Sequence, residues 1–166
     1  MIADVAIRLA TVADAAEIAA MSRDHIEHGL PWRWRRERVA RAIADRDTNV
    51  VVVGEPGGLV AFGIMSYLED DAHLLLFAVR RVSRREGVGS AVLAWLEEVA
   101  RAAGARRIRL EARRENAAAR IFYNEHGYHE RMIRKGMYGQ AADGIRLEKW
   151  LRTTADADAD GAARPG

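Results

Sequence analysis

The stretch LFAVRRVSRREGVGS, residues 76–90, joins an apolar segment to the clearest helical pattern of the chain. From residue 73 the sequence is almost continuously apolar up to Val79, which is typical of a buried central strand. From Val88 onward, apolar residues recur at i+3, i+4, i+7, i+8 and i+11, which predicts an amphipathic helix over 87–103. This strand, loop and helix indicate an α/β sheet and fix the place of the other elements.

The loop in this stretch has the composition of an anion site. Gly87 and Gly89 allow the backbone to approach a ligand closely and to adopt positive φ. The first N–H groups of the helix lack helical partners, and Arg84 and Arg85 add cations that bind phosphate oxygens. Val92 stands where a dinucleotide-binding motif needs its third glycine, and no P-loop lysine follows. The alternatives are a pyrophosphate site and a helix start that merely packs tightly.

Outward from this loop, periodicity and turn residues predict the remaining elements. Thr11 is the expected N-cap of the first helix. Strands are expected at 5–9, 49–54, 59–68, 107–112, 128–134 and 145–151, and further helices at 11–22, 34–44 and 116–126. The fold class is therefore α/β, with a mixed central sheet of about six or seven strands flanked by about four helices.

Composition limits the function further. The chain has 166 residues and no cysteine, which excludes disulfides, thiolate zinc sites and a thiol nucleophile of its own. One domain over 1–152 is expected, followed by a disordered low-complexity tail at 153–166. No membrane span and no signal-peptide core are evident, so a cytoplasmic location is expected. The net charge is +2 and the basic residues are mostly arginine, which suits an anionic partner or only reflects genome composition.

Two parts of the sequence together resemble one family. The pattern Arg84-x-x-Gly87-x-Gly89 resembles the acyl-CoA pyrophosphate loop of the GNAT superfamily of N-acetyltransferases, and EARRENAAARIFYNEHGY, residues 111–128, resembles its later signature. The resemblance covers about 5–151 and is closest to the ribosomal-protein alanine acetyltransferases, which acetylate a protein N-terminal amine. It implies a GNAT fold and an enzyme that transfers acetyl from acetyl-CoA to a primary amine, of a protein N-terminus or a small molecule.

The resemblance also implies how acetyl-CoA is held. The main chain of Phe77 and Val79 would bind pantetheine, and an N–H near Ala78 would polarise the thioester carbonyl. Asn116 would contact the pantetheine or phosphate arm in addition to capping a helix. The expected cofactor-binding residues are Phe77, Ala78, Val79, Arg84, Arg85, Gly87, Val88, Gly89, Ser90 and Asn116. Glu86 and Ser90 depart from the family, in which basic residues are common at these places.

Glu111 and Tyr123 are the expected catalytic residues. A free α-amine has a reference pKa of about 7.7–8.0, so a base helps it to attack. Glu111 matches the family's catalytic glutamate, and the alternative is a surface carboxylate paired with Arg109 or Arg113. Tyr123 would donate a proton or a hydrogen bond to the departing thiolate, and the alternative is core packing.

The acceptor side is less defined. His28, Trp32, Trp34 and Tyr138 are the expected substrate-binding residues by the resemblance, although both tryptophans also suit anchors of the first helix pair. The pairs His25/His28 and His126/His129 have a spacing that sometimes marks metal ligands, but no third ligand is obvious, so no metal is expected. A CoA-binding regulator without activity is the alternative function. Nucleic-acid binding through 32–41 is disfavoured because no helix-turn-helix signature is present. The expected partners are acetyl-CoA and an amine acceptor, with a homodimer left open.

Overall fold

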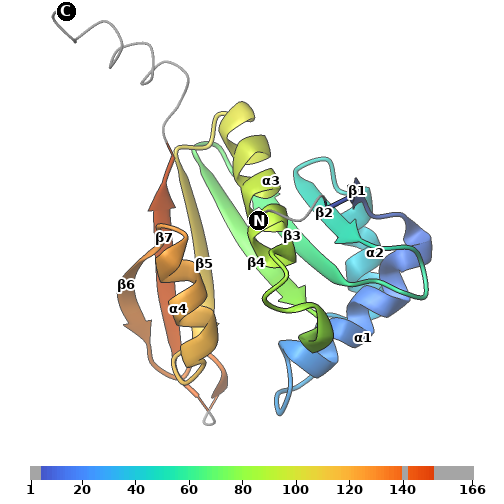
Figure 1. Ribbon diagram of the computed structural model, residues 1–166. Coiled ribbons are helices and arrows are strands. Elements are labelled where there is room, and N and C mark those ends of the chain that lie inside the picture. The colour runs from blue at the N-terminus through green and yellow to red at the C-terminus, as the bar shows by residue number, and fades with distance from the viewer. Residues whose placement is uncertain (1–4, 140–141, 152–166) are drawn as a thin grey trace, which may run out of the picture. The chain divides into compact units, whose positions relative to one another are not determined.

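The computed structural model describes residues 5–139 and 142–151 and contains every predicted helix and strand (Figure 1). The strand order is β1-β2-β3-β4-β5-β7-β6, a mixed seven-stranded sheet accompanied by four α-helices. This confirms the predicted fold class. The elements are β1 (Ile7–Leu9), the 3-10 turn η1 (Val12–Asp14), α1 (Ala15–His25), α2 (Arg36–Ala44), β2 (Thr48–Val53), β3 (Ala61–Tyr67), β4 (Asp71–Val79), the 3-10 turn η2 (Arg81–Ser83), α3 (Val88–Ala102), β5 (Arg107–Arg113), α4 (Ala117–Glu125), β6 (His129–Arg134) and β7 (Gly144–Trp150).

Contacts divide the chain into two compact units. The first unit runs up to Ser66 and includes Leu74–Leu96, and the second comprises Tyr67–His73 and the chain from Glu97 onward. Strand β4 begins in the second unit and continues in the first. The expected tail at 153–166 lies outside the described residues. Among the residues that are described, none of the helices is long and apolar enough to cross a bilayer.

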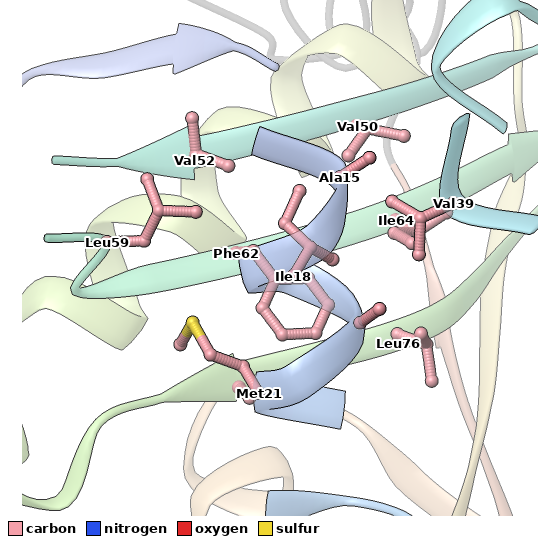
Figure 2. Packing of buried hydrophobic residues seen from close by; sticks show 12 residues of the cluster. Ala15, Ile18, Met21, Val39, Val50, Val52, Leu59, Phe62, Ile64 and Leu76 are labelled. Atoms are coloured by element: carbon pink, nitrogen blue, oxygen red, sulfur yellow. The ribbon is translucent and has the colours of Figure 1, made fainter. Parts of the chain in front are cut away.

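The core of the first unit lies between α1 and the strands β2, β3 and β4. Figure 2 shows Ile18 and Met21 of α1 beside Phe62 of β3 and Leu76 of β4. Strands β1, β2 and β3 pair antiparallel, and the β-branched run Val50–Val52 of β2 is buried. Burial of each large apolar side chain in such a cluster contributes roughly 1.5–3 kcal/mol, so this packing holds α1 against the sheet.

The start of α1 differs from the prediction. Thr11 caps the turn η1, which lies between Thr11 and the α-helix. The Thr11 N–H donates a hydrogen bond of 2.8 Å to the carboxylate of the fully buried Asp14. Arg8 of β1 donates two hydrogen bonds to the same carboxylate, at 2.8 and 2.9 Å. The helix then continues to His25, beyond the expected end at residue 22. This ion pair couples the first strand to the helix entry.

Helix α3 approaches β3 closely within the first unit. A Cβ added to Gly63 of β3 would lie 2.9 Å from Cδ1 of Leu96, closer than real Cβ contacts allow. Val92, Leu93 and Leu96 of α3 are fully buried. The glycine therefore sets the distance between α3 and the sheet.

The second unit contains an antiparallel group in the order β5-β7-β6. In its register Glu111 of β5 faces Arg146 of β7, which faces Met132 of β6. Helix α4 is joined to β6 by a bidentate ion pair between Arg120 and Glu130, with distances of 2.7 and 3.0 Å. These contacts position the chain segment from Glu111 to α4, which contains the predicted catalytic residues.

Candidate active site

The predicted phosphate loop is a tight turn that opens α3. Gly87 has φ +81° and its carbonyl accepts the helical hydrogen bond of the Ala91 N–H at 3.1 Å. Gly89 does not adopt positive φ as the sequence suggested, because it lies inside the first turn of α3. Arg85 does so instead, with φ +69°. A non-glycine residue in this region is strained, and such strain is concentrated at functional sites.

Cations surround this loop in the first unit. Arg84 donates from Nε to the Val79 carbonyl at 3.1 Å, which ties the loop to the end of β4, and the Arg85 side chain is exposed. At the end of α1, burial and then the charges of Arg84, Arg80 and Arg81 lower the pKa of His25. Arg81, Arg84 and Arg85 thus bring positive charge to this loop, as binding of a diphosphate requires.

The end of β4 leads directly into the loop. Ala78 and Val79 are buried, whereas Phe77 is half-buried on the alternate face of the strand. The main chain continues past Val79 to Arg80, whose N–H bonds to the Val60 carbonyl at 2.9 Å. Phe77, Ala78 and Val79 thus lie on a fixed strand next to the helix start, as the resemblance requires.

Glu111 forms the most distinctive polar contact of the second unit. Its Oε2 lies 2.6 Å from Nε2 of His73 at the start of β4, and its Oε1 lies 3.4 Å from Arg146. The Glu111 side chain is only 8% exposed, against 22% for His73. The alternative of a surface carboxylate paired with Arg109 or Arg113 is therefore wrong, because the carboxylate is buried and its partners come from neighbouring strands.

The surroundings of Glu111 keep it ionised. Burial alone would raise the pKa of Glu111, but the His73 hydrogen bond and the charges of His73, Arg146 and Arg109 outweigh burial and lower it below its usual value. A carboxylate of low pKa is a weak base toward an ammonium group. It is well suited to orient an imidazole and to stabilise its protonated form, which is the role of the carboxylate in hydrolase triads.

Tyr123 lies buried on α4. Its ring makes edge contacts with Phe122 and Tyr128, at centroid distances of 5.4 and 5.7 Å. Burial, and then the neighbouring Tyr138, raise the pKa of Tyr123 far above its usual value. Burial and the charge of Glu111 also raise the pKa of Tyr138. The fold thus brings Glu111, Tyr123 and Tyr138 into one electrostatic neighbourhood, with His73 as a fourth member.

Asn116 begins α4 as predicted. Its side-chain oxygen accepts a hydrogen bond from the Ala119 N–H at 3.1 Å, which is ordinary N-cap geometry. The amide nitrogen is not used in this contact. The expected contact with the cofactor remains a prediction.

The predicted acceptor residues of the first unit fall into two groups. His28 is exposed, whereas Trp32 and Trp34 are half-buried against the core and Trp32 donates from Nε1 to the Ala19 carbonyl at 3.2 Å. The packing alternative therefore describes how both tryptophans are held. Their role toward a substrate remains a prediction.

His73 is the functional candidate that the sequence analysis missed. It appeared only as one residue of a nearly continuous apolar strand. The alternating burial of β4 places His73 on the same face as Phe77, and that alternation was the available signal. Its partner Glu111 is 38 residues away, so no local pattern could join them.

Comparison with known proteins defines the family. The model of the Acetyltransferase (GNAT) family matches residues 16–128. The "[Ribosomal protein bS18]-alanine N-acetyltransferase" of Escherichia coli (strain K12) is 32% identical over 117 residues, which are 69% of this chain and 77% of that protein. The chain therefore belongs to the GNAT family of acetyltransferases. This membership confirms the predicted class of enzyme, an N-acetyltransferase.

Solved structures agree with this assignment. The crystal structure of the ribosomal-protein-S18-alanine N-acetyltransferase from Escherichia coli is 26% identical, with a TM-score of 0.73, and the match covers 90% of this chain and 95% of that chain. The PaiA N-acetyltransferase from Thermoplasma acidophilum, solved in complex with coenzyme A, is 16% identical with a TM-score of 0.74 over 89% of this chain and 99% of that chain. At 16% identity, the likeness to the PaiA structure shows the fold alone.

Proposed function

We propose that the enzyme transfers the acetyl group of acetyl-CoA to the α-amino group of a polypeptide. The observation that carries this proposal is the buried Glu111 carboxylate, held 2.6 Å from the more accessible His73 imidazole. The imidazole offers a nitrogen for the proton that an attacking α-ammonium must lose, and the ionised Glu111 carboxylate stabilises the imidazolium that forms. The E. coli relative, named for acetylation of an alanine of ribosomal protein bS18, supports this choice of acceptor.

We assign the binding of acetyl-CoA to residues of the loop before α3, the end of β4 and Asn116. Gly87 and the first turn of α3, with Val88, Gly89 and Ser90, would receive the diphosphate together with Arg84 and Arg85. The main chain at Phe77, Ala78 and Val79 would hold the pantetheine arm and the thioester carbonyl, and Asn116 would add a polar contact. A helix N-terminus and mobile guanidinium groups are the usual components of a diphosphate site, which supports this assignment.

The reaction follows from the properties of these groups. The ammonium loses its proton to His73, directly or through water, and Glu111 stabilises the imidazolium that results. The neutral amine then attacks the thioester carbon, the new C–N bond forms, and the C–S bond breaks to release the thiolate of coenzyme A. The attacking nitrogen then carries two hydrogens, of which one stays on the amide and the other leaves to solvent, and the thiolate takes up one proton to give the thiol of coenzyme A.

Tyr123 would stabilise the leaving thiolate. Because its pKa is raised, the phenol remains protonated throughout the neutral range and is a constant hydrogen-bond donor. A thiol has a reference pKa of about 8.5, so complete proton transfer from this phenol would be uphill. We therefore assign to Tyr123 a strong hydrogen bond to the sulfur of the thiolate. The proton that the thiolate finally takes up comes from solvent.

The acceptor class can be tested with matched substrates. The enzyme is expected to acetylate a peptide with a free N-terminus, and not the same peptide with a blocked N-terminus and a free lysine side chain. Mass spectrometry of the products and thiol release report the reaction. Acetylation of small amines with no peptide turnover would contradict the proposal. Tight binding of CoA without turnover of any amine would favour the regulator alternative.

Tyr123→Phe tests the leaving-group role. We expect kcat to fall roughly 10–100-fold, with little change in the affinity for acetyl-CoA, because the hydrogen bond forms mainly to the thiolate. Tyr128→Phe is the matched control: this neighbouring phenol is 1% exposed, and within the part of the chain that the structure describes its hydroxyl has no hydrogen-bond partner. Equal kinetics of both variants would leave Tyr123 a packing residue.

A further inference from the structure

Five exposed arginines form an uncompensated positive surface at the start of α2. They lie within nine residues that contain a single acid, Glu37, so the segment has a formal charge of +4, whereas the whole chain has +2. Nine arginines elsewhere in the described residues, among them Arg8, Arg107 and Arg120, form ion pairs with carboxylates. Within residues 5–139 and 142–151, no ion pair involves the five. This arginine surface consists of Arg33, Arg35, Arg36, Arg38 and Arg41.

The backbone beneath the arginine surface is firmly held. The buried Glu27 accepts hydrogen bonds from the Arg33 N–H at 2.7 Å and the Trp34 N–H at 3.2 Å, and also from the Ser22 hydroxyl. These hydrogen bonds hold the two ends of the segment between α1 and α2 together. Charged groups on a fixed backbone lose little conformational entropy when they bind a partner.

The tryptophans beneath fix two of the guanidinium groups. Arg35 lies 4.7 Å from the Trp32 ring centroid, and Arg38 lies 4.0 Å from that of Trp34. A stacked guanidinium still presents its N–H edges to carboxylates. Each of these rings already has a guanidinium group over it, which disfavours stacking of a nucleobase at that place.

The arginine surface lies in the same unit as the strand end to which we assign the thioester. Trp32 and Trp34 pack against the buried cluster that contains Leu76 and Ala78 of β4. Figure 2 shows Val39 of α2 next to Ile64 of β3, and Leu76 of β4 belongs to the same cluster. His25 lies at the other end of the segment that joins α1 to α2. Burial and then the charge of Arg84 in the loop before α3 lower the pKa of His25. The tryptophans that lie under Arg35 and Arg38 thus pack against the cluster to which Leu76 and Ala78 of β4 belong.

From these contacts we infer that the enzyme selects acceptor polypeptides with several acidic residues shortly after the acetylated N-terminus. This inference rests on the proposed function and adds the substrate class. An extended acceptor advances about 3.3 Å per residue, so its positions 4 to 8 lie roughly 10–25 Å from the amine. We place the arginine surface, which lies in the same unit as the end of β4, within this reach, so carboxylates at these positions would bind its guanidinium groups.

Initial rates with three peptides test this inference. Each peptide has about ten residues and the same first three, followed by five acidic, neutral or basic positions that extend over roughly 16 Å. We expect kcat/KM to be about tenfold higher for the acidic than for the neutral peptide, mainly through KM, because each exposed ion pair is weak. The preference should decline as salt is added. Equal kcat/KM for all three would overturn the inference but not the proposed function, which fails only if none is acetylated.

A double substitution isolates the arginine surface. Arg33→Gln with Arg36→Gln leaves both stacked arginines in place, so folding should be unaffected, and the acidic preference should fall to about threefold or less. The control Arg46→Gln with Arg106→Gln removes the same charge from other exposed positions and should keep the preference. If both double variants lost the acidic preference to the same extent, the preference would not come from the arginine surface. Salt-sensitive RNA binding that only the first pair abolishes, with no peptide preference, would assign the surface to nucleic acid instead.

Discussion

Glu111→Gln is expected to lower kcat/KM by about 10²–10⁴-fold, the usual contribution of a general base. The amide keeps the size of the side chain but removes the charge that would stabilise protonated His73 across the 2.6 Å contact. The affinity for acetyl-CoA should change little, since the effect is on proton removal. His73→Gln should lose a similar factor, and the double variant should lose scarcely more, because the two residues act as a unit.

The pH dependence distinguishes a base from a structural pair. Since the pKa of Glu111 is lowered, its carboxylate stays ionised at neutral pH and does not itself produce the acid limb. In the wild type, kcat/KM should remain high at pH values where the free acceptor is largely ammonium. In His73→Gln, the profile should follow the acceptor amine, with a half-maximum at about pH 7.7–8.0. Parallel profiles that differ only in height would contradict a role in proton transfer.

Gly89→Trp should abolish detectable binding of CoA, a loss of at least about 100-fold in affinity. The indole would fill the space in front of the first turn of α3, where we place the diphosphate, and would shield its N–H groups. In the wild type, CoA at 100 times its Kd should stabilise the protein by about 2.7 kcal/mol, and the variant should show no such shift. Calorimetric titration and thermal unfolding with and without CoA provide the two measurements.

The control for this change lies on the same helix. Glu98 of α3 is 74% exposed, so Glu98→Trp adds the same indole away from the helix start. It should bind CoA as the wild type does. Unchanged affinity for CoA in Gly89→Trp would show that the diphosphate does not bind at this loop, whatever the control shows. Unfolding of Gly89→Trp alone would be visible in its thermal transition without ligand.

Local sequence patterns were sufficient for the elements. The period of α3 and the alternation of β5 arise from which residues face the core, so they can be seen without knowledge of the partners. The N-cap role of Asn116 likewise depends on residues three positions apart. These local patterns were wrong at the turn η1, at the end of α1, and at Arg85 and Gly89, where the loop decides the backbone angles.

The site was predicted in part. The resemblance identified Glu111 and Tyr123, but the electrostatic state of each depends on groups distant in sequence. Arg146 is 35 residues from Glu111, and the pKa of Tyr123 on α4 is raised by burial and then by Tyr138, which lies between β6 and β7. The unpaired charge of the arginine surface was equally hidden, since composition counts arginines without showing which of them meet a carboxylate.

The sequence by itself determined the order of strands and helices, the glycine-opened helix start and the family, because these depend on residues close together in the chain. Only the tertiary structure decided that His73 meets Glu111, that Arg85 rather than Gly89 takes the left-handed conformation, and that Trp32 and Trp34 carry arginines on their faces. Proton affinity and exposed charge are set by burial and by the nearest opposite charge, and both arise only when distant segments pack.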